Sequence, residues 1–234
     1  MEKKIILSPS LMCGDLANLE GSIQELESIG MDSLHIDVID GSFSPSMPLG
    51  IETIKRIREI TSMNFDVHIM AKDNDNEFFI GEMLKIGVES ITFHYETSLH
   101  IDRYIQLIKN SGTKVGIALN PATPLNVLQY ILPEIDRICL MLINPGFATN
   151  KSEKQVSYAL KKITDLCQLV NEKELAVDIQ VDGRGSLETI PGLLDAGATN
   201  LVLGSTSLFL KGNTLAENQK LLYQAMKQSV RKNQ

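Results

Sequence analysis

The chain has 234 residues, of which 43% are hydrophobic and 22% are charged. Its formal net charge of −7 excludes broad binding to a nucleic-acid backbone, which needs a positively charged face. Three scattered cysteines, Cys13, Cys139 and Cys167, exclude a disulfide framework and a cysteine-rich zinc site. Cys139 lies in an apolar run, and we expect it to be buried as a small hydrophobic residue.

No stretch of the sequence resembles a linker, a signal peptide or a membrane span. The apolar residues that follow Lys4 end at Ser8-Pro9-Ser10, and no apolar run approaches the roughly 18 residues that cross a bilayer. We therefore expect one soluble, cytoplasmic domain over residues 1–234, without a nucleic-acid or membrane partner.

Short β-branched runs recur along the chain with amphipathic segments between them. The clearest of these segments, Leu16–Ile29, Glu52–Ile60 and Ile101–Asn110, have apolar residues three and four apart, as helices do. The runs predicted as strands are Ile5–Leu7, Ser33–Asp37, Asn64–Ile69, Ser90–His94, Lys114–Ala118, Arg137–Leu142, Ala176–Val181 and Asn200–Leu203. Eight strands alternating with helices indicate a parallel sheet, and their number favours a closed (β/α)₈ TIM barrel over an open doubly wound sheet.

Glycines precede several of the predicted strands, at Gly30, Gly87, Gly112 and Gly197. A glycine at the end of a helix takes the left-handed conformation that turns the chain into the next element. These four positions therefore support the predicted alternation of helices and strands.

Polar residues gather at the carboxyl ends of the strands, where barrels of this kind carry their chemistry. The second strand ends at His35–Asp37, the third at Asp66–Met70, the fourth at His94 and the seventh at Asp182. Alternate residues of a strand share a face, so His35 and Asp37 point the same way, into the mouth of the barrel.

Two imidazoles and two carboxylates converge from three strands at this mouth. His35, Asp37, His68 and Asp182 are the residue types of a divalent-metal site with mixed nitrogen and oxygen ligands. The alternative is a polar core without function, because barrel interiors do bury occasional polar groups. For His94 the choice between support of the site and plain structure stays open, and His100 is expected at the surface.

Glycine-rich turns follow the last three strands, at Asn144–Phe147, Asp182–Gly185 and Gly204–Ser205. Glycine lets backbone amides approach an anion, and the loops after the last strands of such barrels commonly hold phosphate. A tight strand-to-helix turn would explain each of these glycine segments equally well. Met70, Met141 and Phe43 fall near the same mouth, where they either pack in the core or exclude water from a reacting carbon.

Taken together, these segments closely resemble the ribulose-phosphate 3-epimerase family. The resemblance runs in the family's order from residue 8 to residue 205 and is specific as a combination. The segments are Ser8–Ser10, His35–Phe43, Asp66–Met70, Asn120–Pro124, Asn144–Phe147 and Val181–Gly183.

The resemblance implies a role for each matching position. His35, Asp37, His68 and Asp182 match the family's ligands of one divalent metal ion, zinc, iron, manganese or cobalt, and Asp37 and Asp182 match its paired acid and base. The positions that match substrate and phosphate contacts, or that line the mouth, are Ser10, His68, Met70, Met141, Gly146, Phe147, Ala148, Thr149, Gly183, Arg184, Gly204 and Ser205. The implied partner is a small phosphorylated ketose, and the implied assembly is a homodimer or homohexamer.

The implied reaction inverts carbon 3 of a phosphorylated 2-ketose. That carbon is adjacent to a carbonyl, so loss of its proton leaves a 2,3-enediolate, whose charge a divalent cation would stabilise. Inversion needs one carboxylate to remove the proton and a second to return one to the opposite face.

Several positions depart from the family's usual pattern. Ile39 stands where methionine is usual, Ser44–Ser46 and Ala148–Asn150 differ at the rim, and Arg184 replaces a glycine. Arg184 is either a charged donor to phosphate or a solvated turn residue. The segment Ser8–Cys13 and the non-glycine at Arg184 resemble the allulose-6-phosphate 3-epimerase branch, so both five- and six-carbon substrates stay open.

Two other classes of function remain as alternatives. One is a different enzyme on a phosphosugar barrel, an isomerase, aldolase or decarboxylase. A Schiff-base aldolase would need a lysine at the mouth, and Lys114 begins its strand at the opposite end. The other is a barrel that binds a phosphosugar without catalysis.

Overall fold

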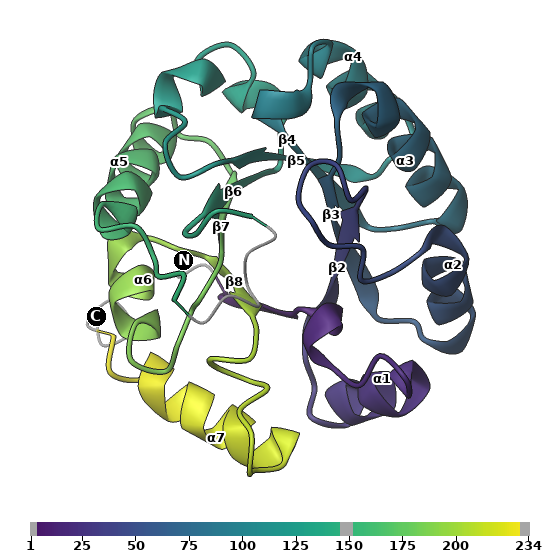
Figure 1. Cartoon of the computed structure of the whole chain (residues 1–234). Coiled ribbons are helices and arrows are strands. Elements are labelled where there is room, and N and C mark those ends of the chain that lie inside the picture. Colours follow the sequence, from purple (N-terminus) through teal and green to yellow (C-terminus); the bar gives the residue numbers. More distant parts are fainter. Residues whose placement is uncertain (1–3, 146–151, 230–234) are drawn as a thin grey trace.

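The computed structural model describes residues 4–145 and 152–229, which form a ring of parallel strands surrounded by helices (Figure 1). Neighbouring strands pair in the order β1-β8-β7-β6-β5-β4-β3-β2. The strands are β1 (Ile6–Pro9), β2 (Ser33–Ile39), β3 (Asn64–Met70), β4 (Ser90–His94), β5 (Lys114–Leu119), β6 (Arg137–Met141), β7 (Asp178–Asp182) and β8 (Asn200–Leu203). From β2 to β8 each strand pairs with the next strand in sequence, and β1 pairs with β8, which confirms the predicted barrel.

The ring closes between β1 and β2 just beyond the end of β1. Ser10 forms a parallel bridge with His35, and its backbone N–H donates to the carbonyl of Leu203 on β8 at 2.9 Å. Ser10 therefore joins two strands at the carboxyl end of the barrel.

Seven α-helices are present in the described residues, and none is long and apolar enough to cross a membrane. Short 3₁₀ helices at Leu125–Leu128 and Leu132–Glu134 replace an α-helix between β5 and β6. The α-helices are α1 (Leu19–Ser28), α2 (Ile51–Ile60), α3 (Asp73–Ile86), α4 (Ile101–Asn110), α5 (Ala159–Glu172), α6 (Ile190–Ala196) and α7 (Leu215–Met226).

Helix α1 begins at Leu19, three residues later than its apolar spacing predicts. The side chain of Asn18 accepts the backbone N–H of Gly21 at 3.2 Å, and that of Asp15 accepts the N–H of Ala17 at 3.0 Å. Capping side chains compete with the helix for backbone donors, so they hold the preceding residues in a turn.

Two strands begin and end later than predicted, because pairing with their neighbours sets their limits. β1 runs to Pro9 opposite Leu203, and β7 begins at Asp178 opposite Arg137. The glycines predicted at helix ends behave as expected, since the φ angles of Gly30, Gly87, Gly112 and Gly197 are all positive, between 69° and 118°.

The main hydrophobic core lies between the strands and the helices rather than inside the barrel. On β2, Ile36 and Val38 face outward and belong to the same buried cluster as Ile54 and Ile57 of α2. The alternate, inward-facing positions of the strands are largely polar, and each of the following is at most 6% exposed: Ser8, Ser33, His35, Asp66, Ser90, Gln180 and Asn200. This alternation within parallel strands leaves a buried polar interior that must satisfy its own hydrogen bonds.

One hydrogen-bond pattern repeats at the amino-terminal end of the barrel. The residue just before β2, β4, β6 and β8 uses its side chain to accept the backbone N–H of the second residue in the preceding strand. The pairs are Asp32 with Leu7, Glu89 with Phe65, Asp136 with Val115 and Thr199 with Ile179, at 2.6–2.9 Å. These contacts satisfy backbone donors at this end, which fits its expected role in stability.

Candidate metal centre and active site

A cavity opens at the carboxyl ends of the strands. The predicted metal ligands His35 and His68 are fully buried beneath it. The predicted site residues that line it are Ser10, Asp37, Met70, Met141, Asp182, Gly183, Arg184, Gly204 and Ser205. The predicted contacts Gly146, Phe147, Ala148 and Thr149 lie outside the described residues.

Four side chains from three strands bring one donor atom each together under the cavity. These are His35 and Asp37 of β2, His68 of β3 and Asp182 of β7, and their donor atoms all lie within 4.8 Å of one another. Asp37 Oδ1 lies 3.3 Å from His35 Nε2 and 3.6 Å from His68 Nδ1. Asp182 Oδ2 lies 3.9 Å and 3.5 Å from the same two nitrogens. The structure thus assembles the four residues that the strand ends predicted.

This group fits a divalent metal ion. Bonds of roughly 2.0–2.2 Å to zinc place tetrahedral ligand atoms about 3.3–3.6 Å apart, close to the spacings found here. His35 Nε2 and His68 Nδ1 are buried, and among the described residues neither has a hydrogen-bond partner. Orphaned buried nitrogens are rare unless another species meets them, and imidazole with carboxylate suits zinc, iron, manganese or cobalt.

The second nitrogen of His35 is fixed by a buried carboxylate. His35 Nδ1 lies 3.0 Å from Asp66 Oδ2, the residue opposite it in the register of β2 and β3. Because a carboxylate only accepts, His35 carries a hydrogen on Nδ1, and in its neutral form the lone pair of Nε2 faces the site.

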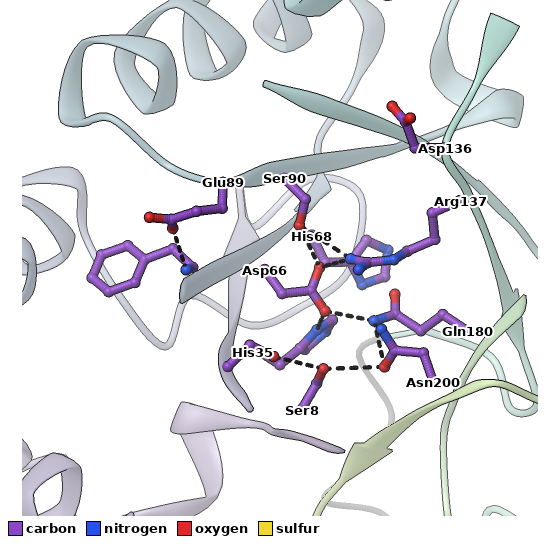
Figure 2. A network of polar contacts seen from close by, with 12 residues as sticks. Ser8, His35, Asp66, His68, Glu89, Ser90, Asp136, Arg137, Gln180 and Asn200 are labelled. Carbon is purple, nitrogen blue, oxygen red and sulfur yellow. Dashed lines mark hydrogen bonds and ion pairs between the residues drawn. The ribbon is translucent and has the colours of Figure 1, made fainter. Parts of the chain in front are cut away.

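Asp66 is the hub of a polar network in the barrel interior (Figure 2). Besides His35, its carboxylate accepts Gln180 Nε2 at 2.5 Å, Ser90 Oγ at 3.2 Å and the guanidinium of Arg137. Burial alone would raise the pKa of Asp66, but Arg137 and His35 outweigh it and hold that pKa well below its usual range. Asp66 is therefore an anion 2% exposed to solvent and neutralised by its neighbours.

The second nitrogen of His68 meets another histidine. His68 Nε2 lies 3.0 Å from His94 Nε2, and His94 Nδ1 lies 3.1 Å from Glu96 Oε2. Burial, together with the charge of His68, lowers the pKa of His94 to about 4, so His94 is neutral at pH 7. His100, in contrast, is exposed, as expected.

The ligand candidates perturb one another's ionisation. Burial would lower the pKa of His35, but Asp37 and Asp66 raise it well above its ordinary value. Burial likewise opposes the raised pKa of His68, which Asp182 and Asp37 cause. Because a protonated imidazole cannot bind a metal, an ion at this site would compete with protons for the two histidines.

Ser10 touches the site through Asp37. Its hydroxyl donates to Asp37 Oδ2 at 3.0 Å, which leaves Oδ1 facing the two imidazoles. The predicted substrate contact thus also orients a carboxylate, a bond that only the closure of β1 onto β2 creates.

The loops after β7 and β8 form the other side of the cavity. Gly183 has a φ of 113°, and a Cβ there would lie 2.7 Å from the side chain of Ile143, so only glycine fits. Arg184 follows with a φ of 56°, a conformation that costs a non-glycine residue about 1–3 kcal/mol. The hydroxyl of Thr206 donates to the carbonyl of Gly185 at 2.8 Å and ties the two loops together.

Several cavity residues were not predicted as contacts. Besides Met12 and Ile39, whose roles the sequence left unassigned, they are Cys13, Ile143, Pro145, Gly185, Val202 and Thr206. Pro145, Gly185 and Thr206 each adjoin a predicted residue in the loops after the last three strands, and that adjacency was the available signal. Burial, with the nearby charge of Asp37, raises the pKa of Cys13 to about 11, so its thiol stays protonated.

The fold and the site define an α/β barrel enzyme with a two-histidine, two-aspartate centre at the carboxyl ends of its strands. The defining pattern of the ribulose-phosphate 3 epimerase family matches residues 6–209. The chain belongs to this family, whose characterised members are isomerases that act on carbohydrates and use a divalent metal.

Individual enzymes of this family are similar to the chain over most of its length. The chain is 36% identical over 201 residues to ribulose-phosphate 3-epimerase of Bacillus subtilis, covering 86% of this chain and 91% of the relative. It is 33% identical over 204 residues to the Escherichia coli enzyme of that name, covering 87% and 88%. The chloroplastic ribulose-5-phosphate-3-epimerase of Arabidopsis thaliana is 33% identical over 203 residues, covering 86% and 70%.

Solved structures with the same fold have distant sequences. A 3-hexulose-6-phosphate synthase from Salmonella typhimurium superimposes with a TM-score of 0.69 at 17% identity, covering 96% of this chain and 100% of that one. An orotidine 5′-phosphate decarboxylase from Pyrococcus horikoshii gives 0.64 at 12% identity, covering 95% and 99%. These likenesses show the barrel alone.

Proposed function

We propose that this chain is a divalent-metal-dependent 3-epimerase that interconverts D-ribulose 5-phosphate and D-xylulose 5-phosphate. The observation that carries the proposal is the pair Asp37 and Asp182, which line the cavity beside two orphaned imidazole nitrogens. The names of the relatives support the five-carbon substrate. His35, Asp37, His68 and Asp182 would hold the ion.

The reaction removes the proton on carbon 3 and returns one to the opposite face. A divalent ion at the site supplies Lewis-acid stabilisation of the negative charge that develops on the enediolate oxygens. Asp37 and Asp182 come from β2 and β7, so two carboxylates approach the substrate from different strands. One acts as base and the other as acid, each transfer contributing about 10²- to 10⁴-fold to the rate.

The remaining cavity residues divide between the reacting carbon and the phosphate. Met70 and Met141 line the cavity beside the aspartates, and their apolar side chains exclude water there. The predicted phosphate contacts after β7 and β8 include two glycines, whose backbone amides suit an anion. Arg184, in the same loop, adds a guanidinium donor to the phosphate.

A six-carbon substrate, D-allulose 6-phosphate, is the second candidate. The residues that favour it are Arg184 and the segment Ser8–Cys13, which resemble the branch that handles this sugar. Met12, Cys13 and Arg184 all line the cavity, so these atypical residues lie where they would distinguish a five-carbon from a six-carbon substrate.

The test is an enzyme-linked epimerisation assay on protein reconstituted with zinc, iron, manganese or cobalt, with each ketose phosphate in turn. Turnover should depend on the metal and fall at least about 10²-fold in Asp37→Asn and in Asp182→Asn. Asp102→Asn, an exposed carboxylate on α4, is the matched control.

Exchange in deuterated water separates the roles of the two aspartates. If each serves one face of carbon 3, each Asn variant should exchange the carbon-3 hydrogen of one epimer while epimerisation is lost. Normal epimerisation in both Asn variants would refute the two-carboxylate mechanism. Failure of both sugars with every metal would refute the proposed activity.

A further inference from the structure

Two hydrogen bonds in series connect His68 to His94 and His94 to Glu96. The two imidazole rings are fully buried, with centroids 5.0 Å apart and planes 23° apart, and their Nε2 atoms are 3.0 Å apart. The other ring nitrogen of His94 lies 3.1 Å from Glu96 Oε2. This is the histidine whose role the sequence left open.

For neutral rings, donor and acceptor rules fix the hydrogens that link Glu96, His94 and His68. The carboxylate of Glu96 only accepts, so His94 carries its hydrogen on Nδ1 and has a lone pair on Nε2. His68 must then donate from its own Nε2. In its neutral form such a histidine has its lone pair on Nδ1, the atom that faces Asp37 at 3.6 Å and Asp182 at 3.5 Å.

His94 and Glu96 are held in place by segments outside the metal site. Glu96 Oε1 accepts the backbone N–H of Asn120 at 2.7 Å and the hydroxyl of Thr123, both in the loop after β5. The ring of Phe43, from the segment after β2, packs on His94 with centroids 4.6 Å apart. With both oxygens of Glu96 bonded and His94 covered, neither side chain is free to rotate and exchange donor for acceptor.

We propose that His94 and Glu96 are positioning residues that select the tautomer of His68 whose Nδ1 is free to bind the metal. The inference rests on the metal site of the proposed function. The same selection at His35 is made by the carboxylate of Asp66 directly, whereas His68 receives it through the intervening imidazole of His94. Because the carboxylate of Glu96 only accepts hydrogen bonds, it determines which ring nitrogen of His94, and in turn of His68, carries the hydrogen.

Three variants separate hydrogen bonding from packing. His94→Phe keeps a buried ring but removes both bonds, and Glu96→Ala removes the acceptor that orients His94. His94→Gln supplies an amide oxygen that accepts from His68 and an NH₂ group that donates to Glu96, so it should restore both hydrogen bonds. Thr92→Val, on the same strand and equally buried, is the matched control for loss of a polar group.

Calorimetric titration of Zn²⁺ into metal-free protein measures the effect without relying on turnover. The dissociation constant should rise about 10- to 100-fold in His94→Phe and Glu96→Ala but less than about threefold in His94→Gln and Thr92→Val. Wild-type affinity in His94→Phe, or equally weak binding in His94→Gln, would overturn the inference while leaving the metal site intact. A wild-type protein that binds no divalent ion would refute the proposed function and the inference with it.

The nitrogen NMR spectrum of histidine in the wild-type protein tests the tautomers themselves. Two-bond proton–nitrogen couplings should show hydrogen on Nδ1 of His94 in the metal-free protein, and on Nε2 of His68 in the zinc-loaded protein. A merely structural histidine would have no reason to keep this pairing. Hydrogen on Nε2 of His94 would overturn the inference even if every variant failed to fold.

Discussion

Replacing Arg137 with methionine removes the cation that compensates Asp66 inside the barrel. Arg137 is 8% exposed and donates to Asp66 and, at 3.1 Å, to Ser90 Oγ. Methionine keeps much of the packing volume, so the loss is mainly one of charge. A buried ion pair broken on one side typically costs about 3–5 kcal/mol, because the remaining charge stays in a poorly solvating interior.

The assay is equilibrium denaturation in urea, followed by circular dichroism, on metal-free protein with chelator present. The free energy of unfolding should fall by about 3–5 kcal/mol in Arg137→Met, a large share of the stability of an ordinary domain. The double variant Asp66→Asn with Arg137→Met removes both charges and should recover most of the loss. A decrease in the free energy of unfolding below about 1 kcal/mol, or a double variant less stable than Arg137→Met alone, would refute the view that Arg137 compensates a buried anion.

Three further predictions concern stability. A Cβ at Gly116 on β5 would overlap Thr92 Oγ1 and lie 3.3 Å from Arg137 Cβ, so Gly116→Ala should lower the free energy of unfolding by about 1–3 kcal/mol in urea titrations; an unchanged midpoint would contradict this packing. The pKa of His94 is 6.5 in the unfolded chain and about 4 in the folded protein, so the unfolded state binds the proton first as the pH drops. The free energy of unfolding of metal-free protein should therefore fall by roughly 3 kcal/mol between these two pH values. His94→Gln should flatten this dependence of stability on pH. Zinc at 100 times its dissociation constant should add about 2.7 kcal/mol and raise the melting temperature by roughly 5–11 °C, and chelation or His68→Ala should abolish the rise.

The sequence by itself determined the barrel and the four residues of its centre. Eight β-branched runs with helices between them have few folded solutions other than a parallel barrel. The period of two along each strand placed His35 and Asp37 on one face, and the rule that chemistry sits at strand ends selected His68 and Asp182. The glycines before the strands marked the helix ends correctly because few other residues tolerate positive φ.

Only the tertiary structure decided how those residues are supported. That Asp66 shares a face with His68 follows from spacing along β3, yet it bonds His35 on the neighbouring strand because of the register between β2 and β3. The same holds for the bond from Ser10 to Asp37, which exists only because the ring closes there. The spacing of residues along one strand determines which face of the sheet each side chain occupies. The stagger between neighbouring strands determines which side chains meet across the sheet, and the packing of the whole barrel sets that stagger.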